Sequence, residues 1–183
     1  MARFKVDPDS GTAYFCTCTI VGWLSIFQNP NYFKIITDSL QYCREHKGIR
    51  LNGYVIMPNH LHLILWPVMG VNLSNVLRDF KRHTARRIIE LLIKDDHVSF
   101  LKFFERAAEL LANEECEHKV WRAGFHPEEI HSQQWFDQKL RYIHENPVRK
   151  GLVDLPEHWR YSSARNYERG DHSVIEVDFI EWY

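Results

Sequence analysis

The sequence predicts a single domain of the α+β class. At 183 residues and 45% hydrophobic content, the chain is long enough to bury one sizeable core. The order of its first segments is strand, helix, strand, strand, and segments with helical periodicity follow. We expect one domain over residues 1–183, with a core from about 12 to 167 and a candidate helical insertion at about 94–118.

The early elements follow from the spacing of apolar residues. The strands alternate β-branched, aromatic and small residues, and the helix carries apolar residues three and four apart. Because proline has no N–H to donate to a ladder, Pro58 interrupts the second strand and makes a turn before His60. The expected elements are a strand at 12–20, a helix from 30 to about 46, a strand at 50–57 and a strand beginning at 60.

The later elements are mostly helical. The residue before a proline is disfavoured in α geometry, so the last predicted helix should end near Asn146, before Pro147. The expected elements are a loop at 67–71, a helix from about 72 to 93, one or two helices within 95–117, a strand or extended segment from 118, a turn at 124–127 and a helix from about 132.

Two histidines lie two residues apart at the start of the predicted third strand. Side chains alternate between the faces of a strand, so His60 and His62 share one face. Their Cα atoms would be about 6.6 Å apart, close enough for two ring nitrogens to converge on one cation. Taken alone, such a pair is more often two half-exposed surface residues.

The predicted helix at 72–93 has one apolar and one basic face. Residues 78–87 hold five cations against the single Asp79, and like charges three and four residues apart repel each other. A charged helix face is usually just solvated, but a row of phosphates would satisfy this one, and we favour nucleic-acid contact. The residues expected to contact DNA here are Arg78, Lys81, Arg82 and Arg86.

The last predicted helix carries a second group of polar residues. Tyr142 and Asn146 are four residues apart and therefore share a face, with Glu145 beside them. Tyr142 could simply pack against a neighbouring element, and Asn146 could simply end the helix. A basic turn follows, and its Arg149 is a further residue expected to contact DNA. The aromatic, hydroxyl-rich segment at 159–167 could either stack bases or seal the core.

Composition limits the classes of function. With a formal net charge of -1, the chain is no general polycation, so nucleic-acid binding requires a local basic surface. The four cysteines lack zinc-finger spacing and are expected to be reduced. The N-terminus has no apolar signal core, and no segment approaches the ~18 apolar residues of a membrane span. We therefore expect a cytoplasmic protein with no membrane association.

Four segments together resemble, in order and spacing, the REP-associated tyrosine transposases. These belong to the single-tyrosine HUH transposases of bacterial insertion sequences. The resemblance extends from about residue 14 to 167, nearly the whole chain, and the two long segments are far more specific than a pair of histidines. The segments are YVIMPNHLHLIL from Tyr54, LRDFKR from Leu77, LRYIHENPVRKGLV from Leu140 and WRYSS from Trp159.

The resemblance implies a ferredoxin-like antiparallel sheet with helices packed on it. It also implies an enzyme that cuts and rejoins single-stranded DNA at imperfect hairpins, with His60 and His62 as metal ligands and Tyr142 as the nucleophile. Asn146 would complete the metal site, and Glu145 is a reserve ligand. The chain departs from the family at Lys150, where a small residue is common, and in the length of 94–119.

The chemistry of these groups is consistent with a divalent cofactor. A mixed nitrogen and oxygen donor set suits Mn²⁺ at least as well as Mg²⁺. Tyrosine attack would store the cut bond as a phosphotyrosine ester. Two alternatives remain: a domesticated protein that binds DNA or RNA hairpins without cutting, and a metal-dependent nuclease that uses water. The expected partners are single-stranded DNA hairpins, and the protein could be a monomer or a homodimer.

Overall fold

The computed structural model describes residues 6, 8, 11–110 and 117–180 of the chain. Its centre is a four-stranded antiparallel sheet in the order β2-β3-β1-β4. The predicted α+β class is confirmed. The strands are β1 (Ala13–Thr19), β2 (Ile49–Met57), β3 (His60–Pro67) and β4 (Glu128–Ile130).

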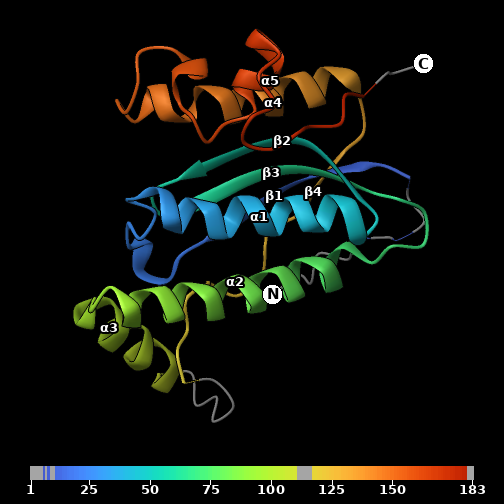
Figure 1. The fold of residues 1–183 in the computed structure, drawn as a ribbon. Helices are drawn as coiled ribbons and strands as arrows, with labels where there is room; N and C mark the ends of the chain where they lie inside the picture. The colour runs from blue at the N-terminus through green and yellow to red at the C-terminus, as the bar shows by residue number, and fades with distance from the viewer. Residues whose placement is uncertain (1–5, 7, 9–10, 111–116, 181–183) are drawn as a thin grey trace.

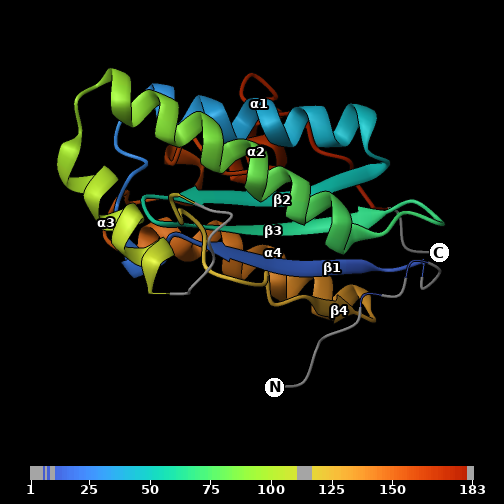
Figure 2. The same ribbon diagram turned by 90° about the horizontal axis from the view of Figure 1, so that it is seen from below.

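Helices cover both faces of the sheet. One face carries α1 (Pro30–His46) and α2 (Leu73–Lys94), and the opposite face carries α4 (Gln133–Arg149), as Figures 1 and 2 show. Three shorter helical elements and α3 complete the described fold: η1 (Val21–Trp23), α3 (Val98–Glu109), η2 (Pro156–His158) and α5 (Ala164–Arg169). No helix within the described residues is long and apolar enough to cross a membrane.

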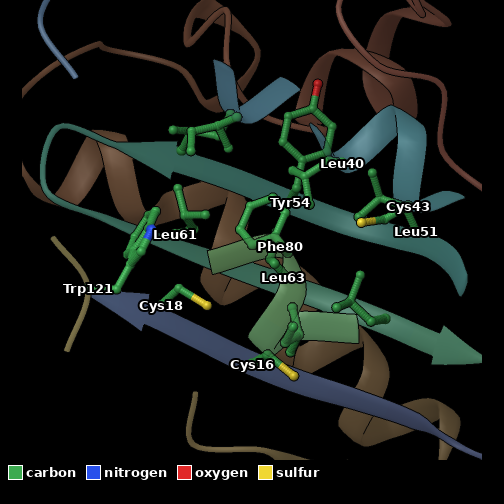
Figure 3. Packing of buried hydrophobic residues seen from close by; sticks show 14 of the residues in the cluster. Cys16, Cys18, Leu40, Cys43, Leu51, Tyr54, Leu61, Leu63, Phe80 and Trp121 are labelled. Carbon is green, nitrogen blue, oxygen red and sulfur yellow. The ribbon is translucent and has the colours of Figure 1, made fainter. Parts of the chain in front are cut away.

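The alternation of side chains along β3 divides the interior into two cores. Leu61 and Leu63 point into the larger core beneath α1 and α2 (Figure 3). Ile64 points to the other face, into a smaller core with Phe136 and Ile143 of α4. His62 pairs across the sheet with Thr17 and Val55, and it therefore belongs to the α4 face.

Most predicted boundaries are confirmed to within a few residues, but the predicted end of the last helix, α4, is wrong. The helix continues through Pro147 to Arg149, and the Lys150 N–H donates to the Asn146 carbonyl. Proline deletes only one helical hydrogen bond, and Asn146 and Pro147 are both buried, so packing outweighs the local preference of the residue before proline.

The segment between α3 and α4 also differs in part from the prediction. The short edge strand β4 was not expected, because three residues carry too little periodicity to recognise. Trp121 forms only an isolated bridge with Ile20, so its segment is extended but is not a strand of the sheet. Cys16, Cys18 and Cys43 are free and buried, and Cys116 lies outside the described residues.

Candidate functional site

The histidine pair of β3 is buried on the α4 face. The exposed fractions of His60 and His62 are 7% and 6%, and their ring centroids are 4.8 Å apart. They are therefore not the half-exposed surface residues that a pair of this kind more often is. Two buried imidazoles need polar partners or a ligand.

Each imidazole is oriented by a hydrogen bond at one ring nitrogen. Nδ1 of His60 lies 2.7 Å from Asn59 Oδ1, and Nδ1 of His62 lies 2.9 Å from Thr17 Oγ1. With a proton on each Nδ1, both Nε2 atoms keep a lone pair, which is the arrangement that metal-binding histidines adopt. Neither Asn59 nor Thr17 was among the predicted site residues. Thr17 could not be recognised, because it meets His62 only through the pairing of β1 with β3.

Burial and nearby cations keep both imidazoles neutral. Burial lowers the pKa of His60 to about 4, and the positive charge of Lys150 acts in the same direction. Burial lowers the pKa of His62 to about 3, with further lowering by His60 and Lys139. Neutral imidazole is the form that coordinates a metal ion. The two lysines were not among the predicted site residues.

Tyr142 lies next to this pair and is accessible to solvent. Its ring centroid is 5.2 Å from that of His62 and 5.9 Å from that of Phe15, edge-on to both. The Arg149 guanidinium carbon lies 5.6 Å from the centre of the phenol ring. The side chain is 38% exposed, so the tyrosine is not a core packing residue. Part of its side chain can therefore be reached from solvent.

Asn146 lies one helical turn after Tyr142 and is buried. It shares a face of α4 with Tyr142, whose ring lies next to that of His62. Two Nε2 atoms and an amide oxygen fit the donor set of a divalent cation.

Glu145, the reserve ligand, is engaged elsewhere. Its carboxylate accepts a hydrogen bond from the Arg149 guanidinium in an exposed ion pair. Among the described residues, no group of three His, Cys, Asp or Glu side chains is placed to hold a metal ion. Glu145 therefore does not form a cluster with His60 and His62.

A buried hydrogen bond sets the position of α4 against the sheet. Nε2 of His144 lies 2.9 Å from Ser163 Oγ. That hydroxyl also accepts the Tyr54 backbone N–H at 3.0 Å and lies 3.2 Å from the Tyr54 carbonyl. His144 lies between Tyr142 and Asn146 on α4. This contact therefore constrains the rotation of α4 about its axis, and with it the directions of both side chains.

The aromatic segment that contains Ser163 seals the core. Tyr161 stacks on Phe33, with ring centroids 3.7 Å apart and planes 3° apart. The indole N–H of Trp159 donates to the Ile56 carbonyl. Of the two alternatives for these residues, packing is the one that the structure favours. No pattern in the sequence indicates that His144 pairs with Ser163.

The predicted DNA-contacting residues of α2 lie on the other side of the sheet from the histidines. Lys81 differs from the rest, because its ammonium donates to the carbonyls of Arg122 and Gly124, both at 2.6 Å. Glu90 pairs with both Arg86 and Arg87, so Asp79 is not the only counter-charge. The side chain of Arg82 is 80% exposed and is held by only one long contact, to Asp79.

A groove of about 720 Å³ separates α2 from residues 117–125. Lysine and arginine side chains line it together with apolar residues and two glutamates, and the exposed arginines of α2 border it. The cationic residues that line it are Arg78, Lys81, Arg82, Arg86, Lys119 and Arg122. Arg149, the remaining predicted contact, lies instead beside Tyr142 on the α4 face.

The fold of this chain is similar to those of two solved structures. A REP-associated tyrosine transposase bound to a REP hairpin superposes with a TM-score of 0.65 at 16% identity, over 100% of this chain and 95% of that one. The chain has the fold of a REP-associated tyrosine transposase. The family named from the sequence segments is thereby confirmed at the level of the fold.

A candidate transposase from Deinococcus radiodurans R1 matches with a TM-score of 0.47 at 17% identity, over 80% of this chain and 95% of that one. No family model matches the chain, and no curated protein matches it.

Proposed function

We propose that the protein is a single-strand DNA transposase that nicks and rejoins hairpin-forming DNA through a phosphotyrosine intermediate on Tyr142. The observation that carries the proposal is the juxtaposition of an accessible phenol with a buried, neutral histidine pair, 5.2 Å from ring to ring. The two groups come from sequence positions 80 residues apart. The phenol is open to solvent while the imidazoles beside it are buried, so a substrate that reaches the phenol would also lie next to the histidine pair.

A divalent metal ion fits the donor atoms of this site. Nε2 of His60, Nε2 of His62 and the amide oxygen of Asn146 would hold Mg²⁺ or Mn²⁺, and the bound ion would neutralise phosphate charge and help to orient the phosphorus. The protein's own residues contribute the rest. Asn59 and Thr17 orient the imidazoles, and His144 with Ser163 aims α4.

The reaction exchanges one phosphate ester for another. The Tyr142 oxygen forms a bond to phosphorus while the bond from phosphorus to the leaving deoxyribose oxygen breaks. The phenol proton is released, and the leaving oxygen takes up a proton. Because the phosphotyrosine retains an ester bond, a deoxyribose hydroxyl can reverse the step and rejoin the strand without an external energy source.

The basic surfaces support a DNA hairpin as substrate. The groove beside α2 offers exposed arginines to a phosphate backbone, and Arg149 offers one more cation beside the nucleophile. The REP-associated neighbour of the same fold was bound to a REP hairpin. We propose a hairpin with single-stranded flanks as the partner of this chain.

Denaturing gels with end-labelled hairpin oligonucleotides test the proposal. Wild-type protein with Mn²⁺ should give a nicked product and a slow band of protein-linked DNA. Tyr142→Phe should still bind the hairpin but give neither species. The double variant His60→Ala, His62→Ala should lose cleavage at any Mg²⁺ or Mn²⁺ concentration. Nicking without a protein-linked band, persisting in Tyr142→Phe, would establish a water-using nuclease instead, and binding without nicking would establish a hairpin-binding protein.

A further inference from the structure

Trp23 is an exposed aromatic residue beside the histidine pair that the proposed chemistry does not use. Its side chain is 53% exposed, and its ring lies edge-on to His60 with centroids 5.6 Å apart. On another side, the guanidinium carbon of Arg122 lies 5.9 Å from the centre of the Trp23 ring. Trp23 therefore borders both the histidine site and the segment that forms the basic groove of α2.

The backbone at Trp23 adopts a conformation that bulky residues avoid. Its φ is 57°, in the left-handed region, directly after Gly22 with φ of 66°. Gly22 accommodates the ring of Phe103 from α3, where a Cβ atom would clash. A strained aromatic residue persists only where the surroundings hold it, and such residues cluster at ligand sites.

The surroundings of Trp23 do hold it. The Asn59 amide donates to the Trp23 carbonyl at 3.1 Å, while its oxygen bonds to Nδ1 of His60. The Trp23 N–H donates to the Ile20 carbonyl, and the Val21 N–H donates to the Val120 carbonyl. One side chain, Asn59, therefore fixes both the tryptophan and the imidazole beside it.

We propose that Trp23 is a stacking site for one unpaired nucleobase of the DNA strand next to the scissile phosphate. An exposed indole offers a wide flat surface, and bases released from a duplex stack on such rings with little regard to sequence. Arg122 supplies a cation for the adjoining phosphate. The inference rests on the proposed function for its substrate, and it adds a base-binding subsite to the metal and tyrosine site.

Binding of a 12-nucleotide oligothymidylate, compared with an abasic strand that has the same phosphates, isolates the contribution of stacking. The wild-type protein should prefer the strand with bases, since each stacked base changes affinity by roughly 5- to 150-fold. Trp23→Ala should reduce that preference by about fivefold or more at a fixed salt concentration, without changing affinity for the abasic strand. Trp23→Phe should retain most of the preference.

Two further variants separate stacking from a structural role. Tyr42→Ala removes an equally exposed aromatic side chain, 52% accessible on α1, and should leave the preference unchanged. Trp23→Gly should lose the preference without lowering the thermal midpoint, because glycine adopts this φ freely. A preference unchanged in Trp23→Ala, no preference in the wild type, or an equal loss of stability and of abasic-strand affinity in Trp23→Gly would overturn the inference.

The same measurements distinguish this inference from the proposed function. Tyr142→Phe should keep the full preference for bases, because stacking does not need the nucleophile. A preference that depends on Trp23 in a protein that forms no covalent DNA adduct would overturn the proposed function alone. Adduct formation together with a preference that ignores Trp23 would overturn the stacking inference alone.

Discussion

Burial sets the charge of the histidines around the site. His60, His62 and His144 all have lowered pKa values, and desolvation is the first cause for each. An imidazole that must remain neutral in the folded protein ties folding to pH. The unfolded chain takes up a proton near pH 6.5, whereas the folded site takes it up only near its own lower pKa.

We predict that the protein loses stability as pH falls from about 6.5 to about 4. In that window the unfolded state binds protons that the folded state does not, so acid favours unfolding. His144, with a pKa of about 4, would contribute about 3 kcal/mol across the window. Urea unfolding at a series of pH values measures the slope. His144→Gln should flatten it by about one proton, and a wild-type slope of zero would contradict the assigned protonation states.

At the scale of elements, α4 works only if it is held at one rotation. The contact between His144 and Ser163 links the middle of the helix to the backbone of β2 at Tyr54. Tyr142 and Asn146 lie two positions to either side of His144, so a rotation of the helix would reorient both side chains and move the phenol away from His62.

We predict that Ser163→Ala and His144→Ala are coupled both in stability and in rate. Each single change leaves a buried polar partner unsatisfied, at a cost of about 1–3 kcal/mol. The double-mutant cycle should show a coupling energy of about 0.5–3 kcal/mol. Single-turnover nicking should slow while the affinity for hairpin DNA stays constant. Energies that simply add, or a loss of affinity at constant nicking rate, would show that this contact does not position α4.

The helix α2 combines a structural lysine with exposed arginines. Lys81 is half-buried and bonded to two backbone carbonyls, and burial lowers its pKa. Arg82 projects into solvent. The sequence pattern placed both residues on one basic face, but only the fold shows that residues 117–125 cover Lys81.

We predict opposite outcomes for these two neighbours. Lys81→Met should lower stability by about 1–2 kcal/mol, because two carbonyls lose their donor, and should leave the salt dependence of DNA binding nearly unchanged. Arg82→Ala should leave stability within about 0.5 kcal/mol but reduce the salt slope by about 0.7 on single strands. Lys34→Ala on α1, also exposed, is the control and should change neither. Equal effects of Lys81→Met and Arg82→Ala on the salt slope would contradict this prediction and indicate that Lys81 contacts DNA.

At the scale of the whole molecule, the sheet separates the two surfaces to which we assign a function. The histidine pair and Tyr142 lie on the α4 face, and the basic groove lies by α2 on the other. Trp23 and Arg122 lie between them. The basic groove and the histidine pair therefore adjoin at these two residues.

Sequence periodicity predicted the sheet strands β1 to β3 and the helices α1, α2 and α4, since these have long regular patterns. The pairing of His60 with His62 and of Tyr142 with Asn146 could also be predicted, because each pair lies within one element. Periodicity could not predict contacts between elements, and only the resemblance to a family implied that Tyr142 meets the histidine pair. Thr17 reaches His62 by strand register, Ser163 reaches His144 across 19 residues, and Trp23 reaches His60 through a strained turn. For the same reason, the sequence could not predict that Lys81 donates to two backbone carbonyls of a distant segment.

The most direct test of the central claim is peptide mapping of the protein after reaction with hairpin DNA and Mn²⁺. Protease and nuclease digestion followed by mass spectrometry should find a nucleotide attached to one peptide of α4, at Tyr142, and no such peptide when EDTA replaces the metal. A nucleotide attached to any other tyrosine, or cleaved hairpin with every tyrosine unmodified, would contradict the account.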